Sequence, residues 1–111
     1  MNIEDLCANY WAVLGYNSSQ LVYKAFPIDE NYRNKESKIM PPKINKNNDI
    51  LTEGFLFNKD GTYINHFLSC GYGSKEGSFK ILSQNELEID GEKRIVKRFV
   101  KGEVLEFDYQ Y

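Results

Sequence analysis

Acidic residues near the C-terminal end of the chain are its first candidates for a binding role. Carboxylates on a surface attract basic partners and speed their association. The candidate partner-binding residues are Glu86, Glu88, Asp90, Glu92, Glu103, Glu106 and Asp108. They surround the basic stretch KRIVKRFVKG, residues 93–102, so a second interpretation stays open. In it, opposite charges pair across strands and only keep the surface solvated.

Two arginines in the basic stretch are candidates for holding an anion. If Asp90-Gly91 and Lys101-Gly102 form two-residue turns, counting outward from them places Arg94 and Arg98 on the apolar side of their strand. In this register Lys97 faces Glu106 and Arg98 faces Leu105. A guanidinium on an apolar face needs an acidic partner, a hydrogen bond or water. Arg98 and Arg94 are therefore candidate ligand-binding residues, and a one-residue slip would put Lys97 there instead.

The chain lacks the usual combinations of catalytic and metal-binding residues. His66 is the single histidine, and neither Cys7 nor Cys70 lies at metal-ligand spacing from it. No serine or cysteine lies in a nucleophile motif, and no glycine-rich loop precedes a helix. We expect no enzymatic activity, no cofactor and no bound metal. The two cysteines are expected to remain free thiols.

Length and charge limit the class of protein. The 111 residues predict one domain, residues 1–111, and the net charge of −2 argues against a nucleic-acid partner. No apolar run approaches the roughly 20 residues of a membrane helix, and the first residues lack the features of a secretory signal. We therefore predict a cytoplasmic protein that binds neither membranes nor nucleic acid.

Short aromatic and β-branched runs between turn residues predict an all-β fold. Asn2 is placed to cap a short N-terminal helix, and strands are expected at 10–16 and 20–26. Six more strands are expected at 52–58, 62–69, 77–83, 86–90, 93–100 and 103–109. Eight antiparallel strands predict an up-and-down barrel or a β-sandwich. The polar segment 27–51 between them is expected to be a long loop, either mobile or functional.

The strand alternation also predicts the core. One side of the last four strands is apolar: Phe79, Ile81, Leu87, Ile89, Val96, Val100, Leu105, Phe107 and Tyr109. In the hairpin from Phe55 to Leu68 both faces are apolar. Phe55, Phe57, Tyr63 and Phe67 share one face, and Leu56, Ile64, His66 and Leu68 share the other. One of the two faces lines the core and the other needs a cover. The candidates are the N-terminal helix, the long loop, a second copy or another protein.

The order FLFNKDGTY, then GSFKILSQNELEI, from about Phe55 to Ile89, resembles the small bacterial lipocalin-like domains. The resemblance implies a closed barrel with a cup for a small hydrophobic molecule. Related fatty-acid carriers hold the ligand carboxylate with interior arginines, and Arg98 is the analogous residue here. The Gly-x-Trp motif of lipocalins is missing, because Trp11 follows Asn9 and Tyr10.

Two functional hypotheses follow from these features. The first is a non-enzymatic protein-binding module, similar in kind to the immunity proteins of contact-dependent growth inhibition, whose partner is a basic, nuclease-type toxin. Small size, acidity, the second apolar face and the missing catalytic set favour it. The alternative is a lipocalin-like carrier of a small hydrophobic anion such as a fatty acid. The sequence leaves open the toxin, the ligand, the oligomeric state and the choice between barrel and sandwich.

Overall fold

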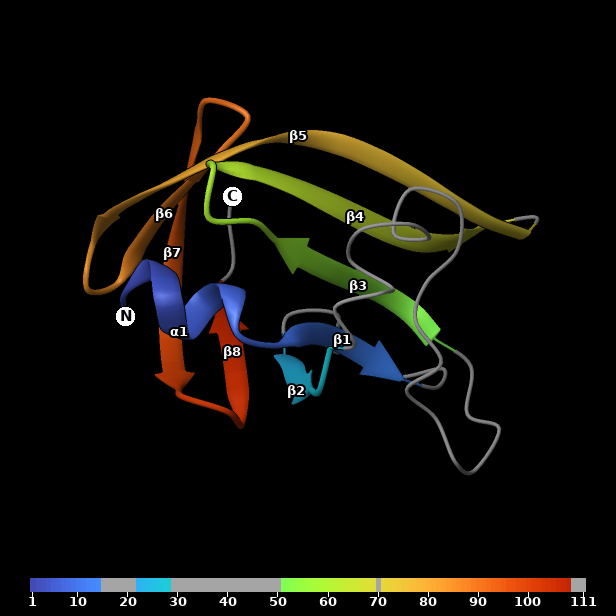
Figure 1. The fold of residues 1–111 in the computed structure, drawn as a ribbon, viewed down its shortest axis with the longest axis horizontal. Coiled ribbons are helices and arrows are strands. Elements are labelled where there is room, and N and C mark those ends of the chain that lie inside the picture. Colours follow the sequence, from blue (N-terminus) through green and yellow to red (C-terminus); the bar gives the residue numbers. More distant parts are fainter. Residues whose placement is uncertain (15–21, 29–50, 70, 109–111) are drawn as a thin grey trace.

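A computed structural model describes residues 1–14, 22–28, 51–69 and 71–108. In this part of the chain, eight antiparallel strands close into a barrel behind one short helix (Figure 1). The predicted all-β fold is confirmed, in its barrel form. The elements are α1 (Ile3–Cys7), β1 (Tyr10–Leu14), β2 (Val22–Phe26), β3 (Leu51–Phe57), β4 (Thr62–Ser69), β5 (Gly71–Ser83), β6 (Glu86–Ile89), β7 (Glu92–Val100) and β8 (Val104–Phe107).

The strand order departs from simple sequence order at one place. Around the barrel the order is β1-β2-β8-β7-β6-β5-β4-β3, so β1 lies between β2 and β3. Both neighbours are antiparallel to β1 and therefore run in the same direction. The chain between Phe26 and Leu51 must consequently connect opposite ends of the barrel, which explains why no short turn is possible there. Residues 29–50, most of the predicted loop, lie outside the described residues.

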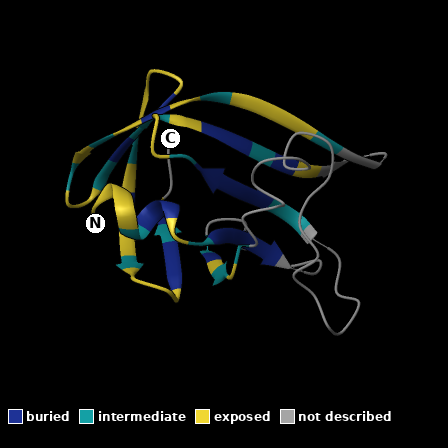
Figure 2. Ribbon diagram, in the orientation of Figure 1, coloured by how far each residue is buried: buried dark blue, intermediate teal, exposed yellow. Residues whose placement is uncertain are grey.

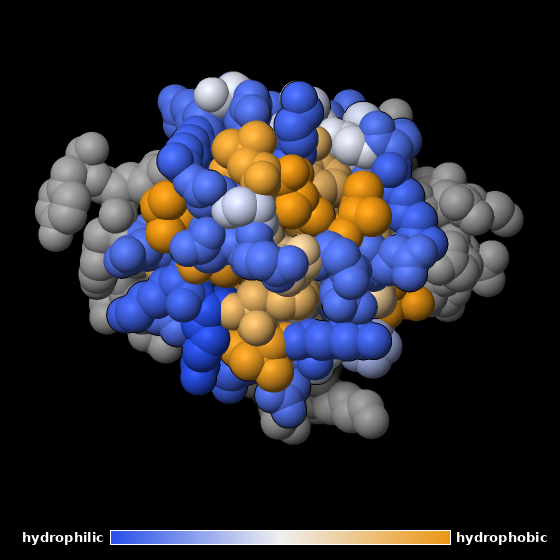
Figure 3. Space-filling view, turned by 90° about the vertical axis from the view of Figure 1, so that its left-hand side faces the viewer, coloured by the Kyte–Doolittle hydropathy of each residue, from blue (hydrophilic) through white to orange (hydrophobic). Residues whose placement is uncertain are grey.

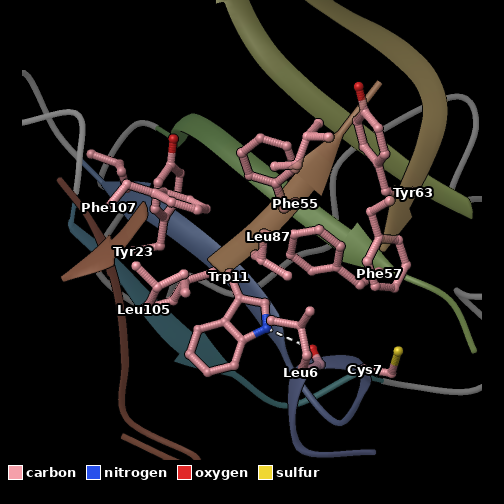
Figure 4. Close-up of a cluster of buried hydrophobic side chains, with 14 residues drawn as sticks. Leu6, Cys7, Trp11, Tyr23, Phe55, Phe57, Tyr63, Leu87, Leu105 and Phe107 are labelled. Atoms are coloured by element: carbon pink, nitrogen blue, oxygen red, sulfur yellow. Dashed lines mark hydrogen bonds between the residues drawn. The ribbon is translucent and has the colours of Figure 1, made fainter. Parts of the chain in front are cut away.

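The helix α1 closes one end of the barrel. The Asn2 side chain accepts a hydrogen bond from the Asp5 backbone N–H at 2.9 Å, which confirms the predicted cap. Leu6 and Cys7 point into the main core. The Trp11 indole N–H donates to the Leu6 carbonyl at 2.7 Å, so this buried hydrogen bond fixes α1 against β1 (Figure 4).

The barrel interior is filled mainly by aromatic rings (Figure 4). Tyr23 lies edge-on to Phe55 and Phe107, with ring centroids 5.4 and 5.8 Å apart, and Phe57 meets Phe79 at 4.9 Å. Such edge-to-face pairs add to the hydrophobic contribution of ring burial. The buried cluster comprises Leu6, Cys7, Trp11, Val13, Tyr23, Phe55, Phe57, Tyr63, Phe79, Leu87, Ile89, Val96, Leu105 and Phe107.

A second buried cluster covers the outer face of β1, β3 and β4. It contains Tyr10, Ala12, Leu56 and Ile64, with Phe26 and Ile28 packed against it. Figure 2 shows β1 and the second half of β3 as buried along their length. The predicted need for a cover is thus confirmed, and α1 is not that cover, because its apolar residues enter the inner core.

The second cluster also buries His66. Its Nδ1 lies 2.7 Å from the Tyr10 hydroxyl. The Tyr10 ring packs directly over Gly54, where no side chain would fit. This face is therefore closely packed around one polar pair.

The register of β5, β6 and β7 follows the prediction. Leu87 faces Arg94, Glu88 faces Lys93, Ile81 faces Leu87 and Lys80 faces Glu88. Asp90 and Gly91 have φ of 52° and 85°, as a type I′ turn requires. The strand β5 is longer than predicted, because Gly71–Ser78 continues the hairpin with β4.

The register of β7 and β8 corrects the prediction. The turn has three residues, 101–103, so Val100 faces Val104 instead of Glu103. A bulge between Val96 and Arg98 then restores the predicted pairing of Val96 with Phe107. Between the turn and the bulge, each β7 side chain therefore points to the face opposite to the predicted one. Val100 is 36% exposed rather than in the core.

Phe99 takes the inward place that Val100 was predicted to have. Its ring packs against Trp11 at 5.5 Å. The other predicted core residues of these strands are buried or half-buried, except Tyr109, which lies outside the described residues.

Candidate functional site

Arg98, the predicted interior arginine, points outward. Its side chain is 60% exposed, and its Nε lies 3.5 Å from a carboxylate oxygen of Glu106. The predicted facing of Arg98 with Leu105 is wrong, since the bulge at Lys97 turns Arg98 to the face that carries Glu106. An exposed ion pair of this kind is no anchor for a ligand inside the barrel.

Arg94 occupies the interior position instead, as predicted. It faces Leu87, and its guanidinium carbon lies 4.5 Å from the centroid of the Phe107 ring. Its Nε is buried and has no hydrogen-bond partner among the described residues. Since a buried N–H without a partner is costly, this group is the best candidate for meeting a ligand.

Arg94 lines a pocket of about 280 Å³ at the barrel end opposite α1. The pairing of β5 with β6 begins only at Phe79, whereas β5 pairs with β4 from Gly71 onward. The β4–β5 hairpin therefore projects beyond β6, and it forms the walls of the pocket together with the β6–β7 turn. The walls combine charged, polar and apolar side chains: Glu53, Phe55, Tyr63, Asn65, Lys75, Ile89, Asp90, Glu92 and Arg94.

Glu53 is the acidic group nearest the barrel interior. Its carboxylate accepts hydrogen bonds from Tyr23 and, at 3.3 Å, from the Asn65 amide. Burial raises the pKa of Glu53, although both hydrogen bonds and the charge of Arg94 act in the opposite direction. Burial, reinforced by Glu53, likewise raises the pKa of the Tyr23 hydroxyl.

Asp90 forms a fixed part of the pocket rim. Its carboxylate accepts hydrogen bonds from the Tyr63 hydroxyl at 2.5 Å and the Ser78 N–H at 3.0 Å, and Lys75 Nζ lies 3.3 Å away. The Tyr63 hydrogen bond, with those from Ser78 and Lys75, lowers the pKa of Asp90. Gly77 leaves the space for this pair, because a Cβ there would lie 2.6 Å from the Tyr63 ring.

The structure does not bring the seven predicted partner-binding carboxylates together. Asp90 and Glu92 lie at the pocket, whereas Glu103 lies in the β7–β8 turn, whose Lys101 pairs with Asp5 of α1. Most of the rest lie on outer faces beside basic side chains. Glu86 forms an ion pair with Lys93. Asp108 follows β8, and its N–H donates to the Ile95 carbonyl.

Glu106 and Glu88 lie on the outer faces of β8 and β6. Glu106 lies 3.7 Å from Lys97 and 3.5 Å from Arg98, and Glu88 faces Lys80 across the sheet. The predicted pairing of opposite charges across strands is confirmed for these residues.

Sequence reasoning missed several pocket residues. Glu53 and Asn65 share the inward alternation of Phe55 and Tyr63, and a polar residue within that apolar series was the available signal. Tyr23 had no such signal. It meets Glu53 because β2 and β3 are both neighbours of β1 in the barrel, which brings these two strands close together.

The described residues offer no other recognisable chemistry. Among them no group of His, Cys, Asp and Glu side chains is arranged to hold a metal ion. Within the same ranges, no helix has the length and apolar character needed to cross a bilayer. Cys7 is buried, and Cys70 lies outside the described residues. The pocket can therefore bind and orient a polar molecule through Arg94 and the flanking carboxylates.

Comparisons with protein-family models, with curated proteins and with solved structures each found no match to this chain.

Proposed function

We propose that this chain is a non-enzymatic binding protein of lipocalin-like type that takes up a small carboxylate-bearing molecule at the mouth of its barrel. One observation carries the proposal: the Arg94 side chain lines the pocket, and its buried Nε has no hydrogen-bond partner among the described residues. A ligand carboxylate would supply the missing acceptor, in the charge-assisted geometry that arginine favours.

Arg94 is held by a contact that does not use its Nε–H. The contact of its guanidinium with Phe107 uses the face of the aromatic ring rather than an N–H group. The group is therefore positioned before a ligand arrives, which reduces the entropy lost on binding.

The size of the pocket favours a short molecule. Its volume of about 280 Å³ lies near the lower end of the typical range for small-molecule sites, about 300–1,000 Å³. Below the pocket, the rings of Tyr23, Phe55 and Phe107 occupy the barrel. A long fatty-acid chain would have to displace these rings, so a short carboxylate fits better than the fatty acid expected from the sequence.

The test is a titration of isotope-labelled protein with propionate, lactate, alanine and dodecanoate, followed by NMR. At least one short molecule should shift the Arg94 Nε–H signal and saturate. Arg94→Gln should weaken that binding by about tenfold or more, a loss of about 1.4 kcal/mol. Arg98→Gln, on the outer face of the same strand, is the matched control and should change nothing. Absence of binding by all short molecules, or tight binding of dodecanoate alone, contradicts the proposal.

A second candidate function, a cytoplasmic inhibitor of a basic toxin, is supported by another observation. Leu82 and Ile95 are 44% and 37% exposed on the outer face of β5 and β7, and Glu86 lies between them, directly opposite Ile95. Figure 3 shows apolar groups gathered between charged side chains on this side of the molecule. An apolar centre beside a carboxylate suits a basic protein surface.

Protection of cells tests this candidate. Co-expression with a nuclease toxin encoded beside the gene should restore growth. Reversal of Glu86, Glu88 and Glu106 to lysine should slow association, while Leu82→Ser should speed dissociation. If no toxin is encoded there, or if the triple variant associates at the original rate, this candidate is wrong.

A further inference from the structure

The charges of the mouth pocket are unevenly distributed. Lys75 and Asp90 neutralise each other at the rim, 3.3 Å apart, and Asp90 also accepts hydrogen bonds from Tyr63 and Ser78. These groups are engaged with one another. The remaining ionisable residues of the wall are the cation Arg94 and two carboxylates, Glu53 and Glu92.

Both carboxylates share the pocket with Arg94. Glu92 is two residues from Arg94 on β7, so both side chains point to the same side of the strand. Glu53 enters the pocket from β3, close enough for the charge of Arg94 to lower its pKa. A simple anion bound to Arg94 would therefore share the pocket with two carboxylates.

We infer that the ligand of the mouth pocket is a zwitterion, with an ammonium group next to its carboxylate, as in a small α-amino acid. This inference rests on the proposed function, because it assigns the carboxylate to Arg94. The ammonium group then takes the other half of the site, between Glu53 and Glu92, and the bound molecule adds no net charge.

Glu53 has the capacity to accept this group. A carboxylate offers about four acceptor positions, and the hydrogen bonds from Asn65 and Tyr23 use two of them. Glu92 is exposed at the rim and can turn toward a bound ammonium group. Burial alone disfavours a charged Glu53, and a neighbouring ammonium group would offset that cost.

The rest of the wall suits the remainder of such a molecule. Phe55 and Ile89 are the apolar residues of the pocket and can contact a short aliphatic side chain. The volume of about 280 Å³ accommodates a small amino acid. We therefore expect alanine, or an amino acid of similar size, to be a suitable probe.

Three related molecules separate the contributions. Alanine has both charged groups, lactate replaces the ammonium group by a hydroxyl, and ethylamine lacks the carboxylate. Calorimetric or NMR titration at physiological salt should find that alanine binds at least about tenfold more tightly than either analogue. If lactate binds as tightly as alanine, the zwitterion inference is overturned while the role of Arg94 stands. If neither alanine nor lactate binds, the proposed function falls as well.

Substitutions in the pocket give an independent readout. Glu92→Gln should weaken the binding of alanine about tenfold and leave the binding of lactate unchanged or slightly tighter. The reason is that only alanine has an ammonium group for Glu92 to contact. Glu53→Gln should act in the same direction, and Arg94→Gln should weaken the binding of both molecules. Glu88→Gln, on the outer face of β6, is the control and should affect neither. Equal effects of Glu92→Gln on alanine and lactate would overturn the inference.

Discussion

Replacement of Gly54 by alanine should destabilise the barrel by much more than the small size of the added methyl group suggests. The reason is the ring of Tyr10, which lies where the new methyl group must go. An ideal Cβ at residue 54 would lie 2.5 Å from the Tyr10 Cζ and nearer still to its Cε1 and hydroxyl oxygen. Tyr10 is fully buried and cannot move outward without breaking its hydrogen bond to His66.

Three terms set the magnitude. Overpacking of a core costs about 1–3 kcal/mol. Loss of the buried 2.7 Å hydrogen bond between Tyr10 and His66 adds a further cost of about 1–3 kcal/mol. Removal of a glycine from a strand returns about 0.5–1 kcal/mol. We expect a net loss of about 3 kcal/mol, a large share of the 5–15 kcal/mol that typically stabilises a domain.

Urea denaturation followed by the fluorescence of Trp11, the single tryptophan, measures this loss. Gly91→Ala is the matched control: no atom lies within 4 Å of its Cβ position, so only the strain of its positive φ, about 1 kcal/mol, should appear. Combining Gly54→Ala with Tyr10→Leu should recover part of the loss, since the smaller side chain frees the space. A loss at Gly54 no greater than that at Gly91 would refute the reasoning.

Three further predictions concern other parts of the barrel. Trp11→Phe should cost about 2 kcal/mol, because it leaves the Leu6 carbonyl without its buried donor, and hydrogen exchange should be fastest in α1. Asp90→Asn should destabilise the barrel at neutral pH, because the Tyr63 hydrogen bond lowers the pKa of Asp90 in the folded protein. The stabilising contribution of the Asp90 carboxylate is therefore present above its ordinary pKa near 4 and is lost as the pH falls through its lower folded-state pKa. The difference from the original protein should therefore shrink in acid, and a constant difference would contradict it. Arg98→Leu should change thermal stability little, within about 0.5 kcal/mol, because its ion pair is exposed; a loss of several kcal/mol would mean that Arg98 is interior after all.

Local features of the sequence were sufficient to predict most strands and the main core. The alternation of large apolar residues places Phe55, Phe57 and Tyr63 on one face, since side chains on a strand alternate between two faces, and the closed barrel turns that face inward. Asp90-Gly91 specifies its own turn, because few dipeptides accept positive φ at both residues. The pairings next to that turn, and with them the inward place of Arg94, followed by counting.

Tertiary structure decided what depends on contacts between distant strands. Lys101-Gly102 is compatible with a two-residue or a three-residue turn, and the bulge at Lys97 that compensates for the longer one has no mark in the local sequence. The position of β1 between β2 and β3 likewise comes from barrel closure, which pairs strands far apart in the chain. Those two choices turn Arg98 outward and bring Tyr23 to Glu53. Alternation determines which residues share a face, but only closure of the hydrogen-bonded ring determines which faces meet around the pocket.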